Sequence, residues 1–110
     1  MNVPYAAVEY IQQNARKYAE AKAKRIYLEE FRKSKKALLM KDALAKGIEA
    51  ANAQEREAYS NLEYLELLEG LQAAIEQEEY IKWMLEAARM KTEIWRTESA
   101  NARMEIKATE

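Results

Sequence analysis

Apolar side chains recur at helical spacing along the first 46 residues of the chain. From Tyr5 to Lys46 there is no glycine or proline, and the side chains of one helical face return every three or four residues. Pro4 suits a first helical turn and Gly47 suits the residue just past the last one, so the pattern predicts a helix over about residues 4–46. The predicted inner face consists of Val8, Ile11, Ala15, Ala19, Lys22, Ile26, Lys33, Ala37, Met40 and Leu44.

A stricter period follows in the second half of the chain. Steps of three and four residues alternate there without a skip through six heptads, which is typical of a coiled-coil seam. The pattern predicts a second helix over about residues 61–107. The predicted seam consists of Tyr64, Leu67, Leu71, Ala74, Glu78, Ile81, Leu85, Ala88, Thr92, Trp95, Ser99, Ala102 and Ile106. Further apolar residues broaden this stripe, so we expect more than one neighbour for this helix: Leu65, Leu68, Ile75, Met84 and Ile94.

The connection between the two predicted helices carries two capping patterns. Asn52 is followed three residues later by Glu55, and Ser60 is followed in the same way by Glu63. These patterns predict a short helical turn over Ala53–Tyr59 and the start of the second long helix at Ser60.

The predicted fold class is all-α. We expect two long antiparallel helices, a helical hairpin or coiled coil, joined by a short helical turn within residues 47–60. The chain has the length of one domain, predicted over residues 1–110. Because two helices cannot cover the broad apolar stripe alone, we expect two chains to form a homodimer, such as a four-helix bundle.

Composition excludes several kinds of chemistry. The chain has two glycines, one proline and no cysteine or histidine, so it lacks thiolates, the commonest general base and the commonest transition-metal ligand. Neither glycine has the neighbours of a phosphate-binding loop, and the cluster Glu76, Glu78 and Glu79 is typical of a solvated helix face. We therefore expect a protein that is not an enzyme, with no catalytic residue, metal site, cofactor or small-molecule substrate.

Targeting features point to the cytoplasm. No apolar run approaches the roughly 20 residues that span a bilayer. Residues 1–10 lack the charged-then-apolar order of a signal peptide. We expect a cytoplasmic protein without membrane contact, located in the host cytoplasm if a phage encodes it.

The net charge of −1 conceals a strong division along the chain. Residues 16–46 hold eleven Lys or Arg and four acidic residues, a net charge of +7, whereas residues 47–81 hold nine Glu and one Arg, a net charge of −8. Such asymmetry steers a charged partner or draws two segments of one fold together.

Four basic residues on the first helix form a candidate binding site, named here the basic face: Arg25, Arg32, Lys35 and Lys36. Aromatic side chains, among them Tyr27 and Phe31, interleave with them. Cations beside aromatic rings suit contact with phosphates and stacking on bases, so single-stranded DNA is a candidate partner.

Two alternatives to a DNA-binding surface stay open for the basic face. It is an ordinary solvated surface if Glu29 pairs with Arg25 and Lys33 at four-residue spacing. It is instead an intramolecular surface if it pairs with glutamates of the returning helix: Glu66, Glu69, Glu76 and Glu79.

A second set of candidate binding residues lies near the C-terminus. Arg89, Arg96 and Arg103 are spaced by heptads, so they share one helical face and can accept carboxylates or phosphates from a partner. The alternative is that they flank a coiled-coil seam and pair with glutamates across the interface.

Three stretches account for about two-thirds of the chain: AEAKAKRIYLEEFRKSKKALLM, AQEREAYSNLEYLELLEGLQAAIEQEE and WMLEAARMKTEIWRTESANAR. They resemble a group of small helical proteins encoded by bacteriophages and prophages, often among genes for DNA recombination. The resemblance implies an accessory role in the host cytoplasm, and it implies no activity and no catalytic residues. The chain departs from the group at Asn61, where a proline is expected in the turn, which leaves the geometry of the break open.

These features support the hypothesis of a non-enzymatic, phage-type accessory protein in DNA recombination or replication. It would bind nucleic acid or a recombination protein through the basic face. The alternative is an inhibitor of a host protein that makes no contact with DNA.

Overall fold

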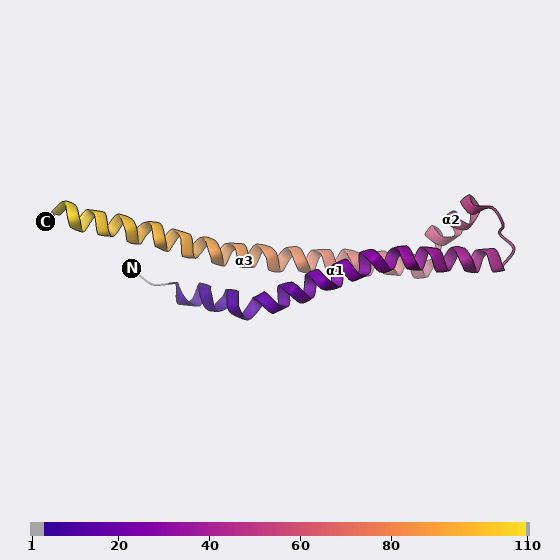
Figure 1. Cartoon of the computed structure of the whole chain (residues 1–110), viewed down its shortest axis with the longest axis horizontal. Coiled ribbons are helices and arrows are strands. Elements are labelled where there is room, and N and C mark those ends of the chain that lie inside the picture. The colour runs from indigo at the N-terminus through magenta and orange to yellow at the C-terminus, as the bar shows by residue number, and fades with distance from the viewer. Residues whose placement is uncertain (1–3, 110) are drawn as a thin grey trace. The chain divides into compact units, whose positions relative to one another are not determined.

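The computed structural model describes residues 4–109 of the chain. They form three helices, α1 (Tyr5–Ala45), α2 (Ala51–Ser60) and α3 (Leu62–Thr109) (Figure 1). Within the described range, only Pro4, residues 46–50 and Asn61 lie outside a helix, and there is no strand. The predicted all-α class is confirmed, and the observed ends of both long helices lie within two residues of the predicted ones.

Gly47 ends α1 as predicted. Its φ of +97° lies in the left-handed region, which glycine adopts without the steric cost of a Cβ atom. The amide of Ile48 donates to the carbonyl of Ala43 at 3.0 Å, and that of Gly47 to the carbonyl of Leu44 at 3.0 Å. These two bonds form a Schellman motif, which satisfies carbonyls at the end of α1 and turns the chain toward α2.

The predicted cap of α2 at Asn52 is wrong. The residue at the N-cap position is Ala50, in extended conformation and without a side-chain cap. The side chain of Gln54 instead donates to the carbonyls of Ile48 at 2.9 Å and Glu49 at 3.2 Å. This glutamine holds the loop before α2, and Asn52 lies inside the first turn of the helix.

The predicted cap of α3 is displaced by one residue. Ser60 is the last residue of α2, and its hydroxyl donates back to the carbonyl of Arg56 at 2.9 Å. Asn61 caps α3 instead, because its Oδ1 accepts from the amide of Glu63 at 2.8 Å, while its own amide donates to Ala58 at 3.2 Å. A proline at this position would lose both bonds, since it has neither an amide hydrogen nor a side-chain oxygen.

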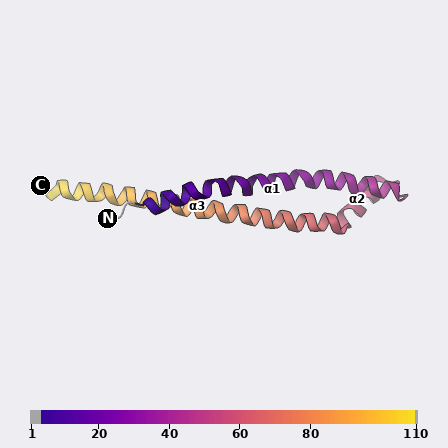
Figure 2. The same ribbon diagram turned by 90° about the horizontal axis from the view of Figure 1, so that it is seen from below.

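Contacts divide the chain into two compact units. One, named here the elbow unit, consists of Glu20–Glu78; the other, the terminal unit, combines the segment up to Ala19 with the chain from Glu79 onward. In each unit a segment of α1 packs beside a segment of α3 that runs in the opposite direction (Figure 2). No helix within residues 4–109 is long and apolar enough to cross a membrane.

The α3 seam follows the predicted spacing. All of its predicted positions from Tyr64 to Ala102 are buried or half-buried, and only Ile106 is exposed. The fully buried members of the seam are Tyr64, Leu71, Ala74, Glu78, Ile81 and Ala88.

The predicted inner face of α1 is wrong. Val8, Ile26 and Leu44 are exposed, and of the predicted positions only Ile11 and Met40 are half-buried. The face that packs inward also follows steps of three and four, but it lies about one residue away and is partly polar. It consists of Ala7, Ile11, Asn14 and Tyr18 in the terminal unit, and of Ala21, Arg25, Leu28, Arg32, Lys35 and Leu39 in the elbow unit. Apolar periodicity could not reveal a face that contains Arg25 and Lys35, whose charges are matched by carboxylates of α3.

The interior of both units is thin. The elbow unit centres on Leu39, Ala58 and Tyr64, against which Met40 and Leu68 pack. Many other buried positions are alanines, and no large side chain among the described residues is fully buried. Two helices in contact bury only one stripe of each, which limits the apolar area that stabilises the chain.

The two glycines provide a matched test of this fold. Gly47→Ala should lower the free energy of unfolding by about 1 kcal/mol, because an L side chain is strained at positive φ. Gly70→Ala should raise it by up to about 1 kcal/mol, because Gly70 lies inside α3 with open space where its Cβ would be. Urea unfolding followed by circular dichroism measures both; effects of equal sign would contradict the structure.

Candidate functional site

Arg25 binds a buried carboxylate in the elbow unit. Its Nε donates to Oε2 of Glu78 at 2.6 Å and its Nη2 donates to Oε1 at 3.0 Å, while Nη1 donates to Glu29 at 3.1 Å. Glu78 is the only charged residue among those buried in the described range. Hydrogen bonds from the guanidinium, first to Glu78 and then to Glu29, raise the pKa of Arg25 above its ordinary value. These hydrogen bonds join α1 to α3.

Lys36 holds α2 against α1. Its Nζ donates to Oε1 of Glu55 at 2.9 Å and lies 4.7 Å from the centre of the Tyr59 ring. Contact with Tyr59 and then Glu55 raises the pKa of Lys36, and the ammonium group lowers the pKa of Glu55. Tyr59 packs edge-on against Tyr64 with ring centres 5.4 Å apart, so this contact connects the ion pair to the core.

Lys35 and Arg32 complete the basic face. Lys35 donates to Glu63 at 3.0 Å. Arg32 is half-buried and has no ion pair with any of residues 4–109. Arg32 and Lys36 are half-buried, because both lie at the packed side of α1.

Three of the four residues of the basic face thus form ion pairs inside the chain. This arrangement matches the alternative in which the basic face pairs with glutamates of the same chain. The glutamates that pair with it are Glu55, Glu63 and Glu78. The glutamates expected in that role are all exposed: Glu66, Glu69, Glu76 and Glu79. The wrong inner face for α1 explains the difference, because a shift of one residue turns a side chain by about 100° around the helix.

Two of the three C-terminal arginines form ion pairs within their own helix. Arg89 Nε donates to Glu86 at 3.3 Å, and Arg96 lies 3.7 Å from Glu93, each pair three residues apart. Arg89 lowers the pKa of Glu86 through a hydrogen bond. Arg103 has no ion pair with the described residues. All three side chains are exposed and leave donors available to a partner.

A second heptad pattern, missed in the sequence analysis, lies on the outer side of α3. Tyr80, Trp83, Ala87, Met90 and Ile94 follow steps of three, four, three and four residues, and all are exposed. We name these five residues the outer stripe. Tyr80 and Trp83 are 62% and 63% exposed, which is unusual for such large rings. The spacing is visible in the sequence, but the seam on the opposite side of α3 gives a longer and stronger pattern.

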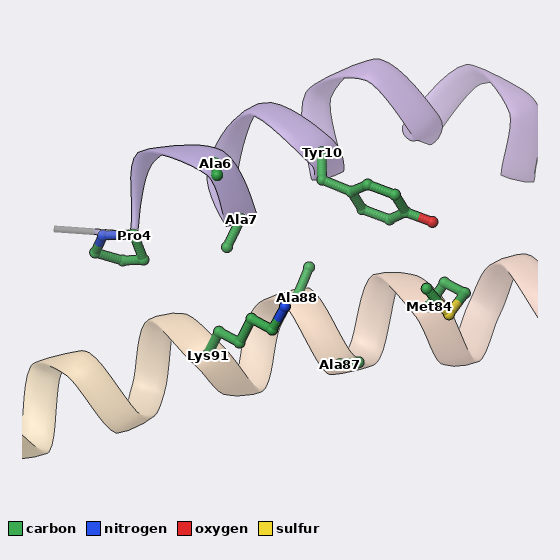
Figure 3. A pocket seen from close by; sticks show the side chains of 8 residues that line it. All are labelled: Pro4, Ala6, Ala7, Tyr10, Met84, Ala87, Ala88 and Lys91. Atoms are coloured by element: carbon green, nitrogen blue, oxygen red, sulfur yellow. The ribbon is translucent and has the colours of Figure 1, made fainter. Parts of the chain in front are cut away.

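An apolar hollow of about 430 Å³ lies next to the outer stripe in the terminal unit. Figure 3 shows the methyl groups of Ala7 and Ala88 directed toward each other across it, with the Tyr10 ring reaching into the space between the helices. Only Tyr10 and Lys91 bring polar side-chain atoms to the lining. The full lining is Pro4, Ala6, Ala7, Tyr10, Met84, Ala87, Ala88 and Lys91. Such a hollow suits an apolar side chain.

Chemistry and similarity give no further guide to a site. Among residues 4–109, no group of three acidic side chains could hold a metal ion. Comparisons with protein-family models, curated proteins and solved structures find no match to this chain. The fold and surfaces therefore define only the class, an all-α protein of two long helices and one short helix.

The buried ion pair can be tested with a double variant. Arg25→Met should destabilise the protein, because Glu78 loses its guanidinium at a buried position. Adding Glu78→Leu should restore most or all of the stability, since an apolar residue then occupies the seam. The measurement is the midpoint of urea unfolding. The control Lys33→Met removes only the exposed pair with Glu30 and should leave the midpoint unchanged. An unchanged midpoint in Arg25→Met would contradict a structural role for the pair.

The Lys36–Glu55 contact should make stability depend on pH. Glu55 has a lowered pKa in the folded state, so its contribution is present above its ordinary value of 4.5 and is lost as pH falls through the lower folded value. Glu55→Gln should therefore be less stable than the wild type at neutral pH, and the difference should close at acid pH. The control is Glu49→Gln, at an exposed residue without an ion pair to the described residues. A difference that is equal at both pH values would refute the contact.

Proposed function

We propose that this protein is a non-catalytic assembly protein that dimerises and acts through protein–protein contacts. The observation that carries this proposal is the outer stripe, an apolar helical face exposed to solvent in the single chain. Large exposed apolar patches mark interaction sites in soluble proteins, because solvating them costs free energy that association recovers.

The thin interior of each unit supports a partner, because no large side chain among the described residues is fully buried. A second chain packed on the outer stripe would bury large side chains that are exposed in the single chain, as in a coiled coil or four-helix bundle.

The ion pairs favour a protein partner over nucleic acid. Arg25, Lys35 and Lys36 already neutralise carboxylates of the same chain. A phosphate could bind them only by competing with those carboxylates, which weakens the electrostatic gain that drives DNA binding. From the resemblance to phage and prophage proteins we propose that the assembly has an accessory role in DNA recombination or replication within the host cytoplasm. An inhibitor of a host protein fits the same surface.

Nucleic acid binding remains a second candidate because of one cluster on α1. Tyr27 and Phe31 stack with ring centres 5.8 Å apart, and Tyr27 is largely exposed. Arg32 and Lys24, which lie next to this pair along α1, have no ion pair with the described residues. Bases of a single-stranded nucleic acid could stack on these rings while its phosphates contact the neighbouring cations.

Sedimentation velocity with a labelled single-stranded oligonucleotide tests both candidates together. We expect the protein at micromolar concentration to sediment as a dimer of the 12.8 kDa chain, and the oligonucleotide to sediment as it does alone. A protein that stays monomeric would overturn the proposal. Co-sedimentation that falls with salt, at a slope of about −0.7 per phosphate contact, would establish the second candidate. Lys24→Glu with Arg32→Glu should then abolish it; Lys36 is left intact because it holds α2.

A further inference from the structure

The outer stripe has the form of a helix-packing surface. Its members alternate three- and four-residue steps, the spacing by which knobs of one helix enter holes of another. Each member precedes a residue of the α3 seam by one or two positions, which places the stripe on the side turned away from α1. The hollow adjoins this surface, because Ala87 belongs to both.

We propose that the outer stripe is covered by the same stripe of a second copy, with the two α3 helices packed side by side and parallel. This inference rests on the proposed function, since it names the surface through which the assembly protein dimerises. The residues in contact would be Tyr80, Trp83, Ala87, Met90 and Ile94 of both chains.

Charges beside the stripe favour a second copy in parallel orientation. Glu86 flanks the stripe on one side and Lys91 flanks it on the other, five residues further on. Parallel helices place such positions opposite each other across the interface, so two symmetric Glu86–Lys91 pairs form. Lys91 has no ion pair with the described residues of its own chain. The Glu86 carboxylate accepts from Arg89 of its own chain and has capacity to accept a further bond from Lys91 of the second copy. The next pair, Glu93 with Glu98, is like-charged, and Arg96 beside Glu93 offsets that repulsion.

The same charges disfavour a lipid surface. Glu79, Glu86 and Glu93 form a row along one edge of the stripe. Amphipathic helices that lie on membranes carry lysine and arginine at these edges, because anionic headgroups repel carboxylates. An apolar helix with mixed flanking charges is the better match for the stripe.

Cysteine cross-linking of the full chain tests the pairing, since the protein has no cysteine of its own. In Ala87→Cys and Ile94→Cys the two new thiols would face each other in a parallel pair, so a short bis-maleimide should link most of the protein as dimers. Tyr27→Cys, on an exposed residue of the elbow unit, serves as control and should remain unlinked. Linking of Ala87→Cys without Ile94→Cys would overturn the parallel orientation.

A charge on the stripe should weaken the dimer without unfolding the chain. Met90→Lys is expected to raise the dissociation constant by more than about tenfold, because the ammonium group would be desolvated in the interface. Leu38→Lys is the matched control, since Leu38 on α1 and Met90 are both 53% exposed. Circular dichroism confirms that both variants remain helical.

The outcomes separate this inference from the proposed function. A wild-type protein that stays monomeric refutes both. A wild-type dimer that is neither cross-linked through Ala87 and Ile94 nor weakened by Met90→Lys refutes the outer stripe as the interface, and leaves the assembly function standing on another surface.

Discussion

The bond between Arg25 and Glu78 determines which face of α1 packs inward in the elbow unit. A buried carboxylate on the α3 seam requires a cation, and a guanidinium satisfies both of its oxygens at once. With Arg25 turned inward, the helical period carries Arg32, Lys35 and Leu39 to the same side of α1. Lys35 and Lys36 then reach Glu63 and Glu55, so α2 and the start of α3 are positioned by the same choice of face.

This pairing explains the division of charge along the chain. The basic segment, residues 16–46, and the acidic segment, residues 47–81, are complementary parts of one fold. Cations of the first form ion pairs with carboxylates of the second within the elbow unit. Charged residues on an inner face stabilise less than apolar ones would, but they restrict the register in which α1 and α3 can pair. The ion pairs between α1 and α3 therefore specify one arrangement of the two helices. The alanine-rich interior alone would leave that arrangement loosely defined.

Four of the large apolar residues that are exposed in the single chain lie on the outer stripe. A helix of a two-helix unit needs only one apolar side, and a second one at heptad spacing has no role within the described chain. The terminal unit thus presents Trp83 and its neighbours to solvent beside an open hollow. This exposed apolar surface is the observation from which the proposed association is argued.

The sequence by itself determined the helices, the end of α1 at Gly47 and the α3 seam. These features depend on local backbone preference and on a single period, and both can be read along the chain. The cap at Asn61 and the inner face of α1 were decided by the tertiary structure. Asn61 and Ser60 are equally good caps in isolation, and the choice depended on how far α2 extends. The inner face of α1 contains Arg25 and Lys35, which become compatible with this position only when carboxylates far along the chain approach them. A charge can lie inside only beside its partner, and only the folded chain shows where that partner lies.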